Sequence, residues 1–171
     1  MLPHLKRDGD LSIILVFHRK SDDDTTLVDI LTNRTNFQVK EIEDKEVIAN
    51  HTIYVAPPDY HVLIERDFSF SLDYSEKVNY SRPSLDITFE SAAAIFGDSL
   101  VGLLLSGANA DGVEGLRCIK KRGGIVAVQD PATAEVAYMP QKAMDNVAVD
   151  IVMSGNRIED FMQKLPHLFQ R

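Results

Sequence analysis

Two side chains that can do acid–base chemistry each follow closely on an apolar run. His18 comes directly after the run at residues 12–17, and Asp111 lies in the glycine-bearing segment 106–112 that follows three leucines at 103–105. In open α/β sheets, ligands bind and reactions occur beyond the carboxyl ends of the strands. If the two runs form neighbouring strands, the Asp111 carboxylate can fix the tautomer of the His18 imidazole and support general-base catalysis. The two residues are therefore the candidate catalytic pair.

Each of the two residues also has a purely structural interpretation. Asp111 precedes a predicted helix, and Glu114 stands three residues later, where the partner in a capping box would lie. His18, as a single histidine after a strand, could instead bond to a backbone carbonyl. The sequence leaves both interpretations open beside the catalytic one.

The glycine-bearing segment is a poor match to nucleotide-binding motifs. Gly107 and Gly112 have the spacing of the outer glycines in a dinucleotide fingerprint, but Asn109 replaces the glycine that admits a pyrophosphate. The same spacing suits a phosphate loop, yet Val113-Glu114 stands where Lys and Ser or Thr are required. The five histidines are scattered and no cysteine pair exists, so we expect no metal site and no cofactor. Of these histidines, His51 and His61 are expected to be solvated or to lie at the edge of the core.

Composition restricts the class of protein further. The 171 residues are 44% hydrophobic, which lets a single domain over residues 1–171 bury a core without disulfides. Cys118 is the single cysteine and no secretory signal is recognised, so we expect a cytoplasmic location. Apolar runs are far shorter than the roughly 20 residues that span a bilayer, so no membrane insertion is expected. The net charge of −8 argues against nucleic-acid binding.

Short apolar runs predict the strands of a mostly parallel sheet, because strands covered by helices on both faces are almost continuously apolar. Two further runs, 61–64 and 68–72, flank a charged turn and predict an antiparallel hairpin. The strands expected in the main sheet are residues 11–17, 39–41, 52–55, 100–105, 125–128 and 147–153.

Helical periodicity predicts the elements between the strands. Residues 84–96 carry apolar side chains at spacings of three and four, with Ser84 as the expected N-cap. The helix expected at 112–122 ends in three cations, which oppose the helix dipole, and in Gly123-Gly124. The alternation of strands and helices predicts a three-layer αβα fold with a doubly wound, mostly parallel sheet and an antiparallel hairpin appendage. Shorter helices are expected at 25–31, 140–144 and 158–165, and a surface loop at 19–24.

Five segments have the order and spacing of a known family. They are His18 after its strand, residues 53–61, residues 81–86, residues 105–112, and residues 128–134 followed by Met139-Pro140. On these segments nearly the whole chain resembles the CheB-type receptor methylesterase domain of bacterial chemotaxis.

The resemblance implies an activity, a site and partners. Members of the family hydrolyse glutamate methyl esters on the signalling helices of receptors, and many also deamidate glutamines there, with a Ser-His-Asp triad. By position, His18 matches the histidine of the triad and Asp111 matches the aspartate. The implied partners are the cytoplasmic helices of methyl-accepting chemotaxis receptors, and a receiver or methyltransferase domain.

The nucleophilic serine of the family has no counterpart in the sequence. In the family it lies in a Gly-Ala-Ser-rich loop after a first strand, and residues 1–10 resemble only the end of the helix that follows that loop. Ser106 matches a position that is not the attacking group, and Ser12 is expected within a strand, away from its end. Ala108-Asn109 replaces the Met-Gly that many members have near the backbone that stabilises the oxyanion.

Three functions are consistent with these observations. In the first, the natural protein supplies the serine upstream of Met1 and is an esterase, while this chain alone is inactive. In the second, the domain is a non-catalytic module, derived from the methylesterase fold, that docks on a receptor or another partner. In the third, which ignores the resemblance, a small molecule binds at the 107–112 loop of an α/β domain.

Overall fold

Parallel strands form the centre of the fold and fall into two hydrogen-bonded groups. The strands of the first group pair in the order β1 (Ile13–Leu15), β3 (Thr52–Val55), β2 (Gln38–Glu41), and those of the second in the order β6 (Val101–Leu104), β7 (Ile125–Gln129), β8 (Ile151–Met153). All of these pairings are parallel, with Ile13 opposite Ile53 and Leu104 opposite Val128. This arrangement directs the carboxyl ends of the strands within each group toward one edge.

The structure, a computed structural model, describes residues 10–18, 24–165 and 168. Within them, β4 (His61–Ile64) and β5 (Phe70–Asp73) form a separate antiparallel hairpin. Phe70 is fully buried against Tyr54 of β3, with the ring centroids 4.8 Å apart. The hairpin is therefore attached to the first group of strands through an aromatic contact.

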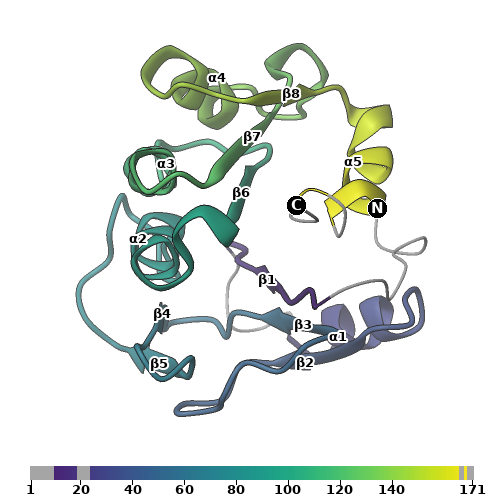
Figure 1. Ribbon diagram of the computed structural model, residues 1–171, viewed down its shortest axis with the longest axis vertical. Helices are drawn as coiled ribbons and strands as arrows, with labels where there is room; N and C mark the ends of the chain where they lie inside the picture. Colours follow the sequence, from purple (N-terminus) through teal and green to yellow (C-terminus); the bar gives the residue numbers. More distant parts are fainter. Residues whose placement is uncertain (1–9, 19–23, 166–167, 169–171) are drawn as a thin grey trace.

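Helices cover both faces of the parallel strands (Figure 1). On one face, side chains of α2 (Leu85–Phe96), α3 (Val113–Lys121) and α4 (Tyr138–Asn146) share a buried cluster with β6 and β7. On the other face, α1 (Asp24–Thr32) and α5 (Ile158–Lys164) share a cluster with β1, β3 and β7. Three short 3₁₀ helices complete the described elements: η2 (Gly97–Ser99), η3 (Pro131–Thr133) and η4 (Gly155–Arg157).

Two glycines allow α2 and α3 to approach closely. A Cβ atom on Gly115 would lie 2.5 Å from the Cβ of Phe89 and 3.1 Å from the Cα of Asp86, both on α2. Gly112, just before α3, has a φ of 97°, a left-handed conformation that favours glycine. The start of α3 is therefore held against the start of α2, which is where the candidate site lies.

The expected fold class is confirmed, and each strand or helix predicted within the described residues is present. The predicted helix at 140–144 is longer at both ends because Pro140 falls in its first turn, where a missing N–H leaves no helical hydrogen bond unmade. The strand expected at 147–153 begins only at Ile151, because the Asp150 side chain accepts the Val126 amide in place of a backbone partner. Most of the loop expected at 19–24 and of the helix end at 1–10 lies outside the described residues.

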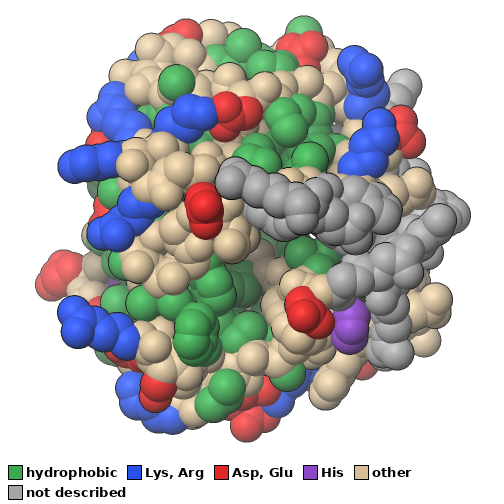
Figure 2. Space-filling model, viewed as in Figure 1, with side chains coloured by type: hydrophobic (Ala, Val, Ile, Leu, Met, Phe, Trp, Pro, Cys, Tyr) green, Lys and Arg blue, Asp and Glu red, His purple; other side chains and the backbone are tan. Residues whose placement is uncertain are grey.

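The surface carries both signs of charge. On the face in Figure 2, Lys and Arg side chains are interspersed with Asp and Glu side chains, and hydrophobic side chains lie between them. None of the helices in the described residues has the length and the apolar character needed to cross a membrane.

Candidate active site

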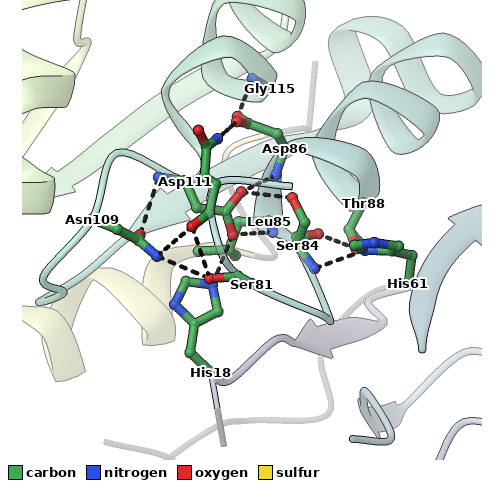
Figure 3. Close-up of polar contacts among 11 residues, drawn as sticks. His18, His61, Ser81, Ser84, Leu85, Asp86, Thr88, Asn109, Asp111 and Gly115 are labelled. Carbon is green, nitrogen blue, oxygen red and sulfur yellow. Dashed lines mark hydrogen bonds and ion pairs between the residues drawn. The ribbon is translucent and has the colours of Figure 1, made fainter. Parts of the chain in front are cut away.

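The ends of β1 and β6 bring His18 and Asp111 together. His18 lies three residues beyond the end of β1, and Asp111 lies in the loop between β6 and α3. The Nε2 atom of His18 is 2.7 Å from the Oδ2 atom of Asp111, although 93 positions separate them in the sequence (Figure 3). The predicted meeting of the two side chains is thus present in the structure, while their catalytic roles remain a prediction.

The Asp111 carboxylate is fully buried, and each of its two oxygens accepts two hydrogen bonds. Oδ2 accepts the Nε2–H of His18 and the amide of Leu85, the latter at 2.6 Å. Oδ1 accepts the hydroxyl of Ser84 at 2.6 Å and the amide of Asp86 at 3.1 Å. Four donors therefore fix the plane of the carboxylate and compensate its burial.

These contacts keep Asp111 ionised. Burial raises the pKa of Asp111, but the hydrogen bonds from His18, Ser84 and the amides of Leu85 and Asp86 outweigh burial and hold the pKa below its ordinary value. An ionised carboxylate only accepts hydrogen bonds, so the Nε2 atom of His18 must carry the proton. The structure thereby defines the tautomer of the neutral imidazole.

Asp111 does not cap the helix that follows it, so the capping-box interpretation is wrong. The N-cap of α3 is Gly112, without a side-chain cap, and Glu114 pairs with Arg117 instead. Because Gly112 turns the chain in a left-handed conformation, Asp111 points away from α3 and accepts the first amides of α2. Asp111 therefore caps α2 instead of α3, and its Oδ2 atom also accepts the hydrogen bond from His18.

A serine and a second histidine support the Asp111 carboxylate. Ser84 is the N-cap of α2, as predicted, but its hydroxyl donates to Asp111 rather than to its own helix. The Ser84 amide donates to Nδ1 of His61 at 3.2 Å, and Nε2 of His61 donates to the carbonyl of Glu76 at 2.9 Å. Figure 3 shows this chain of contacts from His61 through Ser84 to Asp111.

The sequence-based placement of His61 as a solvated or core-edge residue is wrong. Its side chain is completely buried at the start of β4. A buried imidazole is stable only when its nitrogens have partners, and here both partners are backbone groups of residues distant in the sequence. The one sequence signal was that residue 61 closes the segment 53–61 on which the family resemblance rests.

Asn109 ties the segment 106–112 to the turn that precedes α2. Its Nδ2 donates to the carbonyl of Asn79 at 3.1 Å and to the hydroxyl of Ser81 at 2.9 Å, and its Oδ1 accepts the amide of Asp111. The asparagine that departs from the usual family pattern therefore has its amide group engaged in holding the Asp111 backbone. Sequence analysis had considered Asn109 only in relation to a dinucleotide motif and to the oxyanion.

A second buried carboxylate lies on the other side of the helix junction. Asp86 accepts the amide of Gly115 at 2.8 Å through Oδ1 and the side-chain amide of Asn79 at 2.9 Å through Oδ2. Burial raises the pKa of Asp86 to about 6, the Gly115 amide opposes this rise, and the charge of Asp111 adds to it. Sequence analysis did not single out Asp86.

The two carboxylates are expected to give opposite dependences of stability on pH. Asp86 binds its proton more tightly in the folded state, so its ionisation lowers the free energy of unfolding as pH rises from about 4 to about 6. Asp111 binds its proton less tightly in the folded state, so its contribution is full above about pH 4 and is lost as pH falls further. The Asp86→Asn protein should lack the pH dependence that Asp86 causes. Measured by urea unfolding, its free energy of unfolding relative to that of the wild type should therefore be higher above pH 6 than below pH 4.

The comparison of interest is the difference between wild type and variant at each pH, because other acidic groups titrate in both. A difference of about 1–3 kcal/mol between the two ends of the range is expected. Parallel stability curves for the two proteins from pH 4 to pH 7 would show that Asp86 has no raised pKa.

The two serines considered as nucleophiles are engaged elsewhere. The hydroxyl of Ser106 accepts the amide of Val136 at 2.8 Å and lies 3.3 Å from its carbonyl. The hydroxyl of Ser12 donates to the carbonyl of Ala49 at 2.9 Å. Within the described residues, no serine hydroxyl is hydrogen-bonded to His18, so the structure offers neither of these two as the attacking group.

One nitrogen of the His18 imidazole lies outside this hydrogen-bond network. Its side chain is 28% exposed, whereas Asp111 is completely buried. Asp111 occupies Nε2, so the unprotonated Nδ1 is the atom that can accept a proton from a hydroxyl. This is the reverse of the familiar serine protease arrangement, in which the carboxylate holds Nδ1.

Among the described residues, no group of three potential ligands suited to a metal ion occurs.

Comparisons with known proteins find relatives over nearly the whole chain. The family model described as CheB methylesterase matches residues 1–162. A relative from Leptospira interrogans (strain Fiocruz L1-130), described as a protein-glutamate methylesterase/protein-glutamine glutaminase, is 44% identical over 165 residues, which are 96% of this chain and 86% of the relative. A Thermotoga maritima protein with the same description is 29% identical over 168 residues, 96% of this chain and 49% of that protein.

A solved structure shares the fold. The crystal structure of the Thermotoga maritima CheB methylesterase catalytic domain superposes with a TM-score of 0.89 at 29% identity, covering 96% of this chain and 89% of that domain. The likeness therefore covers nearly the whole chain.

Proposed function

Because this chain belongs to the CheB methylesterase family, we propose that it hydrolyses glutamate methyl esters on the cytoplasmic helices of chemotaxis receptors and deamidates glutamines there. The observation that carries the proposal is the 2.7 Å contact between His18 and a fully buried Asp111 carboxylate. A structural histidine does not require an ionised carboxylate held by three further donors. A general base does, because its imidazolium form must be stabilised during the reaction.

The proposed reaction uses a serine as the nucleophile. The serine oxygen attacks the ester carbonyl while Nδ1 of His18 takes the hydroxyl proton, and Asp111 stabilises the resulting imidazolium. The imidazolium then protonates the leaving methoxide, and methanol departs from the acyl-enzyme. In the second half, His18 takes a proton from water, the hydroxide attacks the acyl-enzyme, and glutamate and the free serine are restored.

The finer part of the proposal concerns the source of the serine. Among the described residues no serine hydroxyl is hydrogen-bonded to His18, and Ser12 and Ser106 both contact the backbone, so we place the attacking hydroxyl outside these 171 residues. In that case Nδ1 of His18 is the atom that faces the incoming serine. The remaining residues form a single catalytic domain that supplies the base and its supporting carboxylate.

Methanol release tests the proposed activity. The native protein that contains this chain should release methanol from a receptor fragment methylated at glutamate, and ammonia from the same fragment with glutamine at that position. Each substrate should end as glutamate, which mass spectrometry detects as a loss of 14 Da or a gain of 1 Da, the differences set by CH₂ and by NH₂ against OH. An unmethylated fragment is the control. Tight binding of the methylated fragment without turnover would instead support a binding module.

A further inference from the structure

At the start of each of the helices α2 and α3, a carboxylate accepts backbone amide hydrogen bonds from the start of the other helix. Asp111, at the start of α3, accepts amides from the start of α2, and Asp86, in the first turn of α2, accepts the amide of Gly115 in the first turn of α3. Helix N-termini carry amides without helical partners and a positive partial charge, so each carboxylate stabilises the helix opposite. These reciprocal contacts make the position of either carboxylate depend on the other.

Asp86 is connected to Asp111 by three routes. Its own amide donates to Oδ1 of Asp111 at 3.1 Å. Its carboxylate holds Gly115, three residues into the helix that Asp111 precedes. Its Oδ2 accepts from Asn79, whose carbonyl accepts from Asn109, and Asn109 in turn holds the amide of Asp111. The last route closes a ring of contacts, of which Figure 3 labels Asp86, Asp111 and Asn109.

On the basis of the proposed function, we propose that Asp86 is a positioning residue for the His18–Asp111 pair. By holding Gly115 and Asn79, its carboxylate fixes where the Asp111 carboxylate lies and so keeps Oδ2 within hydrogen-bonding distance of His18. Asp86 does not touch the reacting atoms. It acts through Asp111, as a residue that locks the rotamer and backbone of a catalytic group.

The charged surroundings of Asp86 make its protonation state, and with it the donor in its contact with Asn79, dependent on pH. The neighbouring charges that act on it are Asp111 across the junction and Glu90 one turn along α2, and both disfavour its ionised form. A protonated Asp86 must donate its proton, yet both of its oxygens face donors, Gly115 and Asn79. The Asn79 amide would have to reverse to accept, which exchanges donor and acceptor in that contact and keeps the ring closed.

The experiment follows the imidazole of His18 by ¹H–¹⁵N NMR in the 171-residue chain, which does not depend on esterase activity. In the wild type, the nitrogen shifts should report the neutral tautomer with the proton on Nε2 and a hydrogen-bonded Nε2 proton. In the Asp86→Ala protein, which lacks both acceptors, we expect loss of that proton signal and a mixture of the two tautomers. The His18→Gln protein assigns the resonances.

Asparagine at position 86 separates positioning from charge. In the Asp86→Asn protein, the amide oxygen can still accept from Gly115, and the amide nitrogen can donate to a reversed Asn79. We therefore expect the wild-type tautomer and Nε2 proton to be restored. The inflection near pH 6 in the amide shifts of Gly112 and Gly115 should disappear, because no titrating group remains there.

The matched control is Asp67→Ala. Asp67 also accepts the amide and hydroxyl of one residue, Ser69, but in the turn between β4 and β5. This change should leave the His18 resonances unaltered. Wild-type His18 resonances in a folded Asp86→Ala protein would overturn the proposal. If Asp86→Ala does not fold, an Asp86→Asn protein that keeps the inflection near pH 6, or that fails to keep the Nε2 proton, would overturn it.

The outcome is independent of the proposed esterase reaction. A native protein without methanol release, together with the expected His18 spectra, would refute the reaction and leave the positioning intact. Methanol release together with unaltered His18 spectra in Asp86→Ala would refute the positioning alone.

Discussion

Replacing His18 by alanine is expected to lower kcat for methyl ester hydrolysis by about 10⁶-fold, and replacing Asp111 by alanine by about 10⁴-fold, the losses that the corresponding groups show in a serine protease. The two losses differ because the imidazole transfers the proton, whereas the carboxylate orients it and stabilises its charged form. The measurement is methanol release at saturating substrate by the native protein and its variants.

The double variant is the sharper measurement. If Asp111 acts through His18, the protein with both alanines should be no slower than the His18→Ala protein, because the carboxylate has no imidazole left to orient. The control is His51→Asn, which changes another histidine, tolerates the left-handed φ of 58° at that position, and should keep full activity. Losses that multiply in the double variant would contradict the assigned roles.

The Asp111→Ala protein also loses the cap of α2. The amides of Leu85 and Asp86 and the hydroxyl of Ser84 lose their acceptor, so we expect the free energy of unfolding to fall by about 1–3 kcal/mol. Activity is therefore compared at a temperature where circular dichroism shows both proteins folded. The stability loss alone cannot produce a 10⁴-fold change in the kcat of folded molecules.

The location of the site could be predicted because it depends on chain topology. Apolar runs predict the strands, and in each of the two groups parallel strands direct their carboxyl ends to one edge, beyond which His18 and Asp111 follow β1 and β6. Their contact also requires the two groups to lie side by side, which sequence analysis assumed when it took the two strands as neighbours. No sequence pattern was needed beyond the order of apolar and polar segments.

The support of the site could not be predicted from sequence, because it consists of contacts between distant segments. Asp111 looked like a cap for the nearest helix, since local spacing shows only neighbours along the chain. The donors from the start of α2 lie 25 to 27 positions away, and their approach depends on the left-handed Gly112 and on the space left by Gly115. His61 was misplaced for the same reason, because its partners are backbone groups of other segments.

The second large effect concerns the nucleophile. The 171-residue chain is expected to release methanol about 10⁶-fold more slowly than the same chain extended before Met1 by a segment that carries the proposed serine, because a triad without its serine retains only the catalysis of binding and oxyanion stabilisation. Both proteins are assayed with the same methylated receptor fragment. A fluorophosphonate probe, which labels activated serines, should modify the extended chain at one serine and leave the 171-residue chain unlabelled.

The identity of that serine is then tested by its dependence on His18. Labelling of the extended chain should require the imidazole, so the His18→Ala variant of it should react far more slowly, and replacing the labelled serine by alanine should abolish methanol release. If the 171-residue chain is itself active, the nucleophile lies within it, and Ser106→Ala becomes the deciding variant. The Ser106→Ala change also removes the acceptor of the Val136 amide and could disturb the loop at Val136. A loss of labelling therefore assigns the attack to Ser106 only if the backbone at Val136 keeps its wild-type position. We expect the attacking serine to lie outside the 171 residues. Asp111 already orients the imidazole of His18 through Nε2 and leaves Nδ1 for another group, whereas the hydroxyls of Ser12 and Ser106 already have hydrogen-bond partners.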